Sequence, residues 1–120
     1  MNIGIDVDGT ISSLPEFFSC LTRAFRQAGH KVYIITYREP RAVQATRDQL
    51  DQWRVEYDEI HLCGNTEEIG QWKAKIAAML ELDVMFDDMP QSLCLLAPEV
   101  ARFWLCDPER YDLGAIAGGP

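Results

Sequence analysis

Acidic and hydroxyl side chains close several of the short apolar runs in this sequence. Asp6 and Asp8 close the first run, Thr36 closes the second, and Asp87 and Asp88 close a later one. In an extended segment the side chains at i and i+2 share a face, so the Asp6 and Asp8 carboxylates should point the same way. Grouped carboxylates repel one another unless a cation joins them or some are protonated, and such ligands suit Mg²⁺ better than zinc or copper. The pattern therefore predicts a magnesium site that recruits an anionic substrate, with a phosphate as the first candidate.

Strand-like and helix-like runs alternate from one end of the chain to the other. Short apolar runs typical of strands span residues 3–8, 32–36, 57–63, 83–87 and 100–106. Helical spacing of apolar residues is found over 14–28, after Pro40, from about residue 66, and over 91–96. Ser13, with Glu16 three residues later, predicts a capping box for the first helix, and Gly29 predicts its end.

This order of elements predicts an α/β fold. Apolar strands that alternate with helices indicate a parallel sheet covered on both faces. Right-handed crossovers make a three-layer, doubly wound, Rossmann-like sheet of about five strands the simplest arrangement. Ligands of such sheets lie beyond the carboxyl ends of the strands, where the strand order reverses. The acidic residues, Thr36, Arg38 and Lys73 (at the start of a helix) should therefore meet on one rim.

The same residues carry a resemblance to a known family. Their order and spacing resemble the four motifs of the haloacid dehalogenase-like (HAD) superfamily, over about residues 1–96. The matching residues are Asp6-x-Asp8-Gly9-Thr10, Thr36, Lys73 and Asp87-Asp88. Membership would imply a Rossmann-like catalytic core and a Mg²⁺ cofactor.

The resemblance implies phosphoryl transfer through a covalent aspartyl-phosphate. Asp6 would be the nucleophile and a magnesium ligand. Asp8 would protonate the leaving alcohol and then activate a water molecule, while its backbone carbonyl binds the metal. These roles need Asp6 held ionised by the metal and Asp8 with a pKa raised by its neighbours.

The remaining motif residues would bind the phosphoryl group and the metal. Thr36 would hydrogen-bond the transferring group, and Lys73 would neutralise charge on that group and on Asp6. Asp87 and Asp88 would complete the magnesium shell, with Asp88 favoured as the direct ligand.

Two assignments stay open at this point. Lys75 competes with Lys73, although Lys73 is nearer the start of its helix and its separation from the tandem aspartates fits the family better. Arg38 is either a solvated loop cation or a substrate contact, because its Thr-x-Arg ending resembles nucleotidase-like and polynucleotide-phosphatase-like members. We assign substrate binding to Gly9, Thr10, Tyr37 and Arg38.

The composition of the chain indicates which binding partners and which cellular location to expect. The 120 residues carry a formal net charge of -8, which argues against an extended nucleic-acid surface or an anionic membrane. No run of about 18 apolar residues could span a bilayer. The cysteines lie far apart in apolar surroundings, which predicts buried free thiols at Cys20, Cys63, Cys94 and Cys106. With no basic leader at the N-terminus, a reducing cytoplasm is the expected location.

We expect one catalytic core over residues 1–113 and a flexible tail over 114–120. One helix nearly fills the stretch between Asp8 and Thr36, and a shorter stretch separates Cys63 from Lys73. Neither stretch can hold a folded cap domain, so the pocket should open to solvent. A second subunit could then supply a lid, which keeps a homo-oligomer among the alternatives.

The sequence thus favours a magnesium-dependent phosphomonoester hydrolase that uses an aspartyl-phosphate intermediate. Its first-choice substrate is small and phosphorylated, with nucleotides among the candidates. The alternatives are a phosphatase for a phosphorylated macromolecule, either a nucleic-acid end or a protein, and a non-catalytic domain that binds phosphate or metal.

Overall fold

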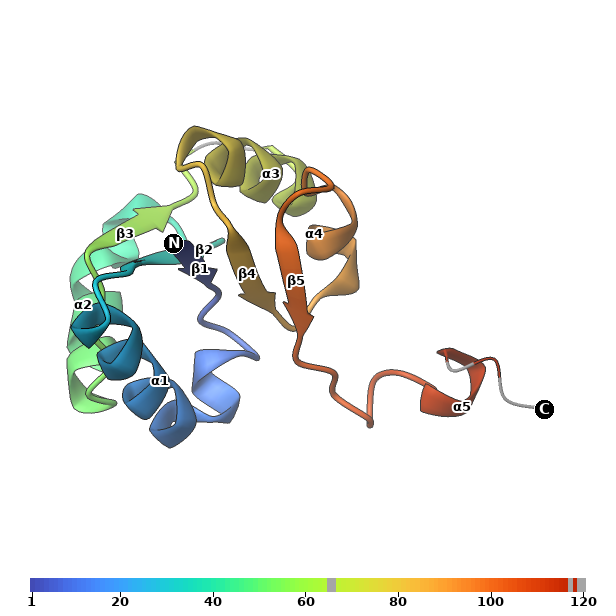
Figure 1. The fold of residues 1–120 in the computed structure, drawn as a ribbon, viewed down its shortest axis with the longest axis horizontal. Coiled ribbons are helices and arrows are strands. Elements are labelled where there is room, and N and C mark those ends of the chain that lie inside the picture. Colours follow the sequence, from blue (N-terminus) through green and yellow to red (C-terminus); the bar gives the residue numbers. More distant parts are fainter. Residues whose placement is uncertain (65–66, 117, 119–120) are drawn as a thin grey trace.

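Five parallel strands form the central sheet of the computed structural model, which describes residues 1–64, 67–116 and 118 (Figure 1). In spatial order the sheet reads β3-β2-β1-β4-β5. The strands are β1 (Asn2–Ile5), β2 (Lys31–Thr36), β3 (Glu59–Leu62), β4 (Val84–Asp87) and β5 (Ala101–Trp104). The parallel α/β sheet expected from the sequence is confirmed.

Helices cover both faces of this sheet (Figure 1). One layer contains α1 (Pro15–Gln27) and α2 (Val43–Gln52), and the other contains α3 (Ile69–Met79) and α4 (Pro90–Cys94). Two 3₁₀ turns, η1 (Ile11–Ser13) and η2 (Pro40–Ala42), precede α1 and α2. Within the described ranges, no helix combines the length and the apolar character that a membrane crossing requires.

Two hydrophobic cores, one on each face, hold the layers together. Ile34 and Ile35 of β2 are neighbours in sequence, and because strand side chains alternate, they enter opposite cores. Ile34 lies in one core with Phe18 of α1 and Leu50 of α2, whereas Ile35 lies in the other with Trp72 of α3. A central strand buried on both faces explains why this run is continuously apolar.

The strand order reverses between β1 and β4. The chain runs outward from β1 through β2 to β3, then crosses back to place β4 on the other side of β1. Ile5 therefore pairs with Ile34 on one side and with Phe86 on the other. Segments that follow β1 and β4 leave the sheet in different directions, which opens the place where doubly wound sheets bind ligands.

The start of α1 differs from the expectation. β1 ends at Ile5, so the strand expected to run to residue 8 stops three residues earlier and the chain turns. The predicted capping box is wrong, because Leu14 is the N-cap and the Ser13 hydroxyl instead donates to the Gly9 carbonyl at 2.9 Å. Gly29 does end α1, and its φ of +88° explains why a glycine stands there.

The third helix begins at Ile69, after Glu68 as its N-cap. The Glu68 carboxylate accepts hydrogen bonds from the Gly70 and Gln71 backbone N–H groups, both at 3.0 Å. The earlier start expected at about residue 66 falls on residues 65–66, which lie outside the described residues.

The C-terminal segment leads from β5 away from the sheet to a one-turn helix, α5 (Leu113–Ile116) (Figure 1). This helix includes the start of the expected flexible tail. Residues 117 and 119–120 lie outside the described residues, so the flexibility of the tail stays a prediction.

The cysteines are free thiols, as expected, but only part of their predicted burial is correct. Cys63 is buried, whereas Cys20 and Cys94 are exposed and Cys106 is intermediate. In α1 the buried positions are Phe18, Ser19 and Thr22, and Cys20 lies two positions from both Phe18 and Thr22, on the opposite side of the helix from them. Cys20 therefore faces solvent although its sequence neighbours are apolar.

Because Met85 is buried and Met79 is exposed, we expect substitutions at these two positions to change the free energy of unfolding by different amounts. Met85 lies at the centre of β4 with 2% of its surface exposed, whereas Met79 at the end of α3 is 63% exposed. We expect Met85→Ala to lower the free energy of unfolding by about 2–5 kcal/mol, because it removes buried contacts and leaves a cavity. Met79→Ala, the matched control, should change it by less than about 0.5 kcal/mol. Urea unfolding measures both, and equal effects would contradict the described packing.

Candidate active site

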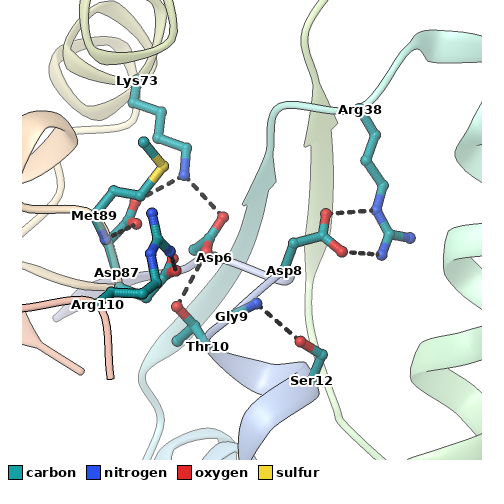
Figure 2. Close-up of polar contacts among 11 residues, drawn as sticks. Asp6, Asp8, Gly9, Thr10, Ser12, Arg38, Lys73, Asp87, Met89 and Arg110 are labelled. Carbon is teal, nitrogen blue, oxygen red and sulfur yellow. Dashed lines mark hydrogen bonds and ion pairs between the residues drawn. The ribbon is translucent and has the colours of Figure 1, made fainter. Parts of the chain in front are cut away.

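The turn after β1 brings the first carboxylate into the sheet edge. The Asp6 backbone N–H still donates to the Phe86 carbonyl at 3.0 Å, which holds Asp6 against β4. The chain then turns, with the Thr10 N–H donating to the Val7 carbonyl at 3.2 Å. The Thr10 hydroxyl donates to Asp6 Oδ2 at 3.0 Å (Figure 2). Asp6 is thereby buried and fixed in orientation.

The end of β4 supplies two more buried carboxylates beside Asp6. The Met89 backbone N–H donates to Asp87 Oδ1 at 3.0 Å, and the Trp104 indole N–H of β5 donates to the Asp88 carbonyl at 3.0 Å. Asp6, Asp87 and Asp88 each offer an oxygen, and these oxygens lie within 4.8 Å of one another. This donor set fits a hard divalent cation such as Mg²⁺, because it consists of carboxylate oxygens alone.

Lys73 of α3 reaches into the same cluster. Its Nζ donates to Asp6 Oδ1 at 2.8 Å and to Asp87 Oδ2 at 2.7 Å, and its side chain is 2% exposed (Figure 2). Lys75 lies on the exposed side of α3 and pairs with Glu67. The structure therefore brings Lys73, and not Lys75, to the carboxylates.

Burial and charge shift the pKa values in this cluster. Burial raises the pKa of Asp6 to about 7, although the neighbouring ammonium of Lys73 opposes the shift. Burial also raises the pKa of Asp87. Burial alone would lower the pKa of Lys73, but the charges of Asp6 and Asp87 outweigh it and raise that pKa. Burial thus disfavours the ionised forms of Asp6 and Asp87, and a bound divalent cation would favour them.

Asp8 does not point toward the other carboxylates. The expectation that Asp6 and Asp8 share a face is wrong, because the extended strand ends at Ile5 and Asp8 lies in the turn. The Asp8 carboxylate instead forms a bidentate ion pair with Arg38, with Nη2 to Oδ1 at 2.7 Å and Nε to Oδ2 at 3.0 Å (Figure 2). Arg38 is therefore anchored, and the description of it as a solvated loop cation does not hold.

The pKa values of Asp6 and Asp8 shift in opposite directions, whereas the expected order, which requires Asp6 to bind the metal, stays a prediction. The hydrogen bonds from Arg38 lower the pKa of Asp8, whereas burial raises that of Asp6. The physical reason is location: Asp8 is exposed and paired with a guanidinium, and Asp6 is buried among other carboxylates.

Thr36 stands at the end of β2 with an unused hydroxyl. It is fully buried, and its Oγ1 has no hydrogen-bond partner within the described part of the chain. A buried hydroxyl without a partner is costly, and such groups call for an explanation such as a ligand. The arrangement therefore leaves a donor available at the carboxyl end of the strand next to β1.

The neighbouring Tyr37 packs between two segments. Its ring stacks on Trp72 with centroids 6.2 Å apart, and its hydroxyl donates to the Glu67 carbonyl. These contacts join the loop after β2 to the start of α3. Substrate binding by Tyr37 stays a prediction, as it does for Thr10, whose hydroxyl binds Asp6.

Gly9 allows the turn to approach Asp88 closely. A Cβ at position 9 would lie 2.1 Å from Asp88 Oδ2, and the φ of Gly9 is +82°. Both the space and the backbone conformation therefore require glycine. Its N–H donates to the Ser12 hydroxyl at 2.9 Å, which further fixes the turn (Figure 2). The described role of Gly9 is thus to admit the Asp88 carboxylate, and contact with substrate stays a prediction.

Sequence reasoning missed three residues of the site. Thr46 Oγ1 and Gln49 Oε1 of α2 accept hydrogen bonds from Arg38 Nη1 at 3.0 and 2.9 Å. Arg110, from the segment after β5, places Nη1 3.4 Å from Asp88 Oδ2. No local pattern marks the α2 residues, and the carboxyl-end rule applied to β5 would have pointed only to the segment that carries Arg110, not to Arg110 itself.

The position of Lys73 predicts a large effect of its removal. Lys73→Met leaves Asp6 and Asp87 buried without their shared cation, and breaking such a buried pair costs about 3–5 kcal/mol. Lys75→Met removes an exposed ion pair and should cost less than about 1 kcal/mol. Chemical denaturation of both variants measures the difference. A smaller loss for Lys73→Met than for Lys75→Met would refute the described cluster.

Comparisons with known proteins identify structural neighbours. Neither protein-family models nor curated proteins match the chain. A solved chain described as "Structure of the Pnkp1/Rnl/Hen1 RNA repair complex" is similar with a TM-score of 0.75 and 15% identity, over 88% of this chain and 42% of that one. A second, "Structure of Pnkp1/Rnl/Hen1 complex", gives a TM-score of 0.72 and 18% identity over 88% and 45%. The chain thus spans less than half the length of these neighbours, and at such identities the likeness shows the fold.

Proposed function

We propose that this chain is a HAD-type, metal-dependent phosphomonoester hydrolase with Asp6 as its nucleophile. The observation that carries the proposal is the buried group of Asp6, Asp87 and Asp88 around Lys73, placed where the strand order reverses. The unpartnered hydroxyl of Thr36 at the next strand end supports it, because a phosphoryl oxygen is a suitable acceptor.

In the first step, a carboxylate oxygen of Asp6 attacks phosphorus and the bond from phosphorus to the leaving oxygen breaks. The leaving oxygen takes the electron pair and accepts a proton from Asp8. Thr36 and Lys73 donate hydrogen bonds to the phosphoryl oxygens, which stabilises charge that develops during transfer. In the second step, Asp8 removes a proton from water, water oxygen bonds to phosphorus, and the phosphorus–Asp6 bond breaks to release inorganic phosphate.

Asp6, Asp87 and Asp88 would hold Mg²⁺. When bound, the ion would balance the carboxylate charge and polarise the phosphoryl group. Capture of the ion would also keep Asp6 ionised, and an ionised carboxylate is required for attack.

Asp8 can serve as the proton donor only after its pair with Arg38 opens. In the described geometry both Asp8 oxygens accept hydrogen bonds from Arg38, which favours the ionised form. An anionic substrate competes with Asp8 for the guanidinium. Opening of this pair on substrate binding would therefore prepare Asp8 to act as the acid and would also direct Arg38 to the substrate.

For the substrate, we favour a phosphorylated nucleic-acid end over a small phosphomonoester. The fold resembles a chain from a complex whose description names RNA repair. An RNA end that carries a phosphate would be a substrate in keeping with that description. The absence of a cap, expected from the short connections, would leave room for a long substrate. The net charge of -8 favours the small-substrate candidate instead, since it opposes an extended nucleic-acid footprint.

If Asp6 is the nucleophile, a conservative substitution at this position should remove most of the phosphatase activity. We expect Asp6→Asn to keep the fold and to lower the release of phosphate from an aryl phosphate by several orders of magnitude with Mg²⁺ present. Asp51→Asn on the exposed side of α2 serves as the control and should match the wild type. Retention of more than about a tenth of the activity by Asp6→Asn would exclude the covalent mechanism. Binding of Mg²⁺ by a wild-type chain with no turnover would favour the non-catalytic alternative.

If the substrate is a phosphorylated nucleic-acid end, kcat/KM should be higher for an RNA oligonucleotide than for a small phosphomonoester. We expect kcat/KM to be at least about a hundredfold higher for an end-phosphorylated RNA oligonucleotide than for a mononucleotide, or about 2.7 kcal/mol in the transition state. Both are measured at one magnesium and salt concentration, with a phosphopeptide as a third substrate. Equal values for the RNA and the mononucleotide would restore the small phosphomonoester as the substrate.

A further inference from the structure

We propose that Arg110 is a specificity-determining residue that binds a phosphodiester of the substrate, outside the site that holds the terminal phosphate. The inference rests on the proposed function and extends it from the reacting phosphate to the chain that follows. It concerns a residue from the C-terminal segment, which none of the predicted motifs includes.

Within the described residues, three cationic side chains pair with aspartates of the candidate site, and they differ in how exposed they are. The Lys73 side chain is 2% exposed, that of Arg38 is 22% exposed, and that of Arg110 is 51% exposed. Lys73 and Arg38 are already held, by the buried aspartates and by Asp8 respectively. Arg110 is therefore the bordering cation with the most surface available to a ligand in solvent.

The contact of Arg110 with the site is weak. Its Nη1 lies 3.4 Å from Asp88 Oδ2, whereas charge-assisted hydrogen bonds are normally about 2.7–2.9 Å. Its guanidinium carbon lies 5.6 Å from the Tyr111 ring centroid, which orients the group without using its N–H donors. A guanidinium offers five donors, so Arg110 keeps the capacity to bind an anion.

The segment that carries Arg110 is nevertheless fixed in place. The Arg110 N–H donates to the Asp107 carbonyl at 3.0 Å, and the Tyr111 ring packs edge-on against Trp104 with centroids 5.3 Å apart. Trp104 in turn binds the Asp88 carbonyl. The backbone around Arg110 is thus tied to the metal-ligand candidates, while the side chain remains free to turn outward.

Arg110 and Arg38 approach the carboxylate cluster from opposite sides (Figure 2). The partner of Arg110, Asp88, belongs to the group that could hold a metal ion. Use of Asp88 by a cation would remove the carboxylate that holds the guanidinium. The guanidinium would then be available to an anion beside the occupied site.

A nucleic-acid end supplies such an anion, and a small phosphomonoester does not. In the proposed function, Thr36, Lys73 and a bound cation would serve the reacting phosphate, so a small phosphomonoester with a single phosphate offers Arg110 no second one. A polynucleotide carries further phosphates along its backbone, and arginine contacts to such phosphates fix the register of the bound chain. Arg110 would therefore favour a long substrate over a short one.

The proposed role of Arg110 can be tested by measuring RNA binding in a variant that does not hydrolyse the substrate. On the Asp6→Asn background with Mg²⁺, we expect Arg110→Ala to weaken binding of a fluorescent single-stranded RNA with a terminal phosphate by about tenfold. The slope of log affinity against log salt should fall in magnitude by about one, because one phosphate contact is lost. Arg23→Ala is the matched control, because its side chain is 49% exposed and pairs with a carboxylate, Glu56, remote from the candidate site. It should bind like the parent.

Turnover separates the role of Arg110 from general damage to the site. Arg110→Ala on the otherwise wild-type chain should lose about tenfold more kcat/KM on the phosphorylated RNA than on an aryl phosphate. Arg110→Lys should restore part of the loss, since it keeps the charge. An equal loss on both substrates would show that Arg110 acts on Asp88 alone and would overturn the inference.

The two proposals fail in different ways. A wild-type chain that hydrolyses none of the phosphomonoesters would refute the proposed function. Hydrolysis by the wild type, combined with unchanged RNA binding in Arg110→Ala, would refute the role of Arg110 and leave the proposed function standing.

Discussion

The contact on which the site depends is the buried ammonium of Lys73 between Asp6 and Asp87. It joins α3 and the end of β4, which are consecutive in the sequence, to the end of β1, which is far from both. Two carboxylates buried this closely are unfavourable without a shared cation, because burial disfavours each charge and the charges repel. The ion pair therefore makes the close approach of Asp6 and Asp87 tolerable, and it fixes the side of α3 that faces the sheet.

The backbone around this contact is shaped by the reversal of strand order. β1 and β4 are neighbours in the sheet although a long part of the chain separates them, so their carboxyl ends place Asp6 beside Asp87 and Asp88. Gly9 then lets the turn after β1 approach Asp88 more closely than any residue with a Cβ could. Fold and cluster thus support one another, since the three carboxylates come together only where these two turns meet at this edge.

The site has a buried centre and an exposed rim with different chemistry. The centre contains carboxylates, an ammonium and the free hydroxyl of Thr36, which together suit a metal ion and one phosphoryl group. The rim contains two arginines, of which Arg38 is held by Asp8 and α2 and Arg110 only loosely by Asp88. Under the proposed function, this division would let the centre carry out phosphate chemistry while the rim distinguishes long substrates from short ones.

The sequence by itself determined the alternation of strands and helices, and with it the carboxyl ends at which Asp6, Thr36 and the tandem aspartates lie. Such patterns are local, because alternating burial and helical spacing need only neighbouring residues. The direction of Asp8 could not be read in this way: β1 stops at Ile5, where hydrogen bonds turn the chain, and a distant arginine takes the carboxylate. The choice between Lys73 and Lys75, left open by the sequence, and the presence of Arg110 depended on how α3 and the segment after β5 pack. Tertiary structure decided these because each requires contacts between residues that no local pattern connects.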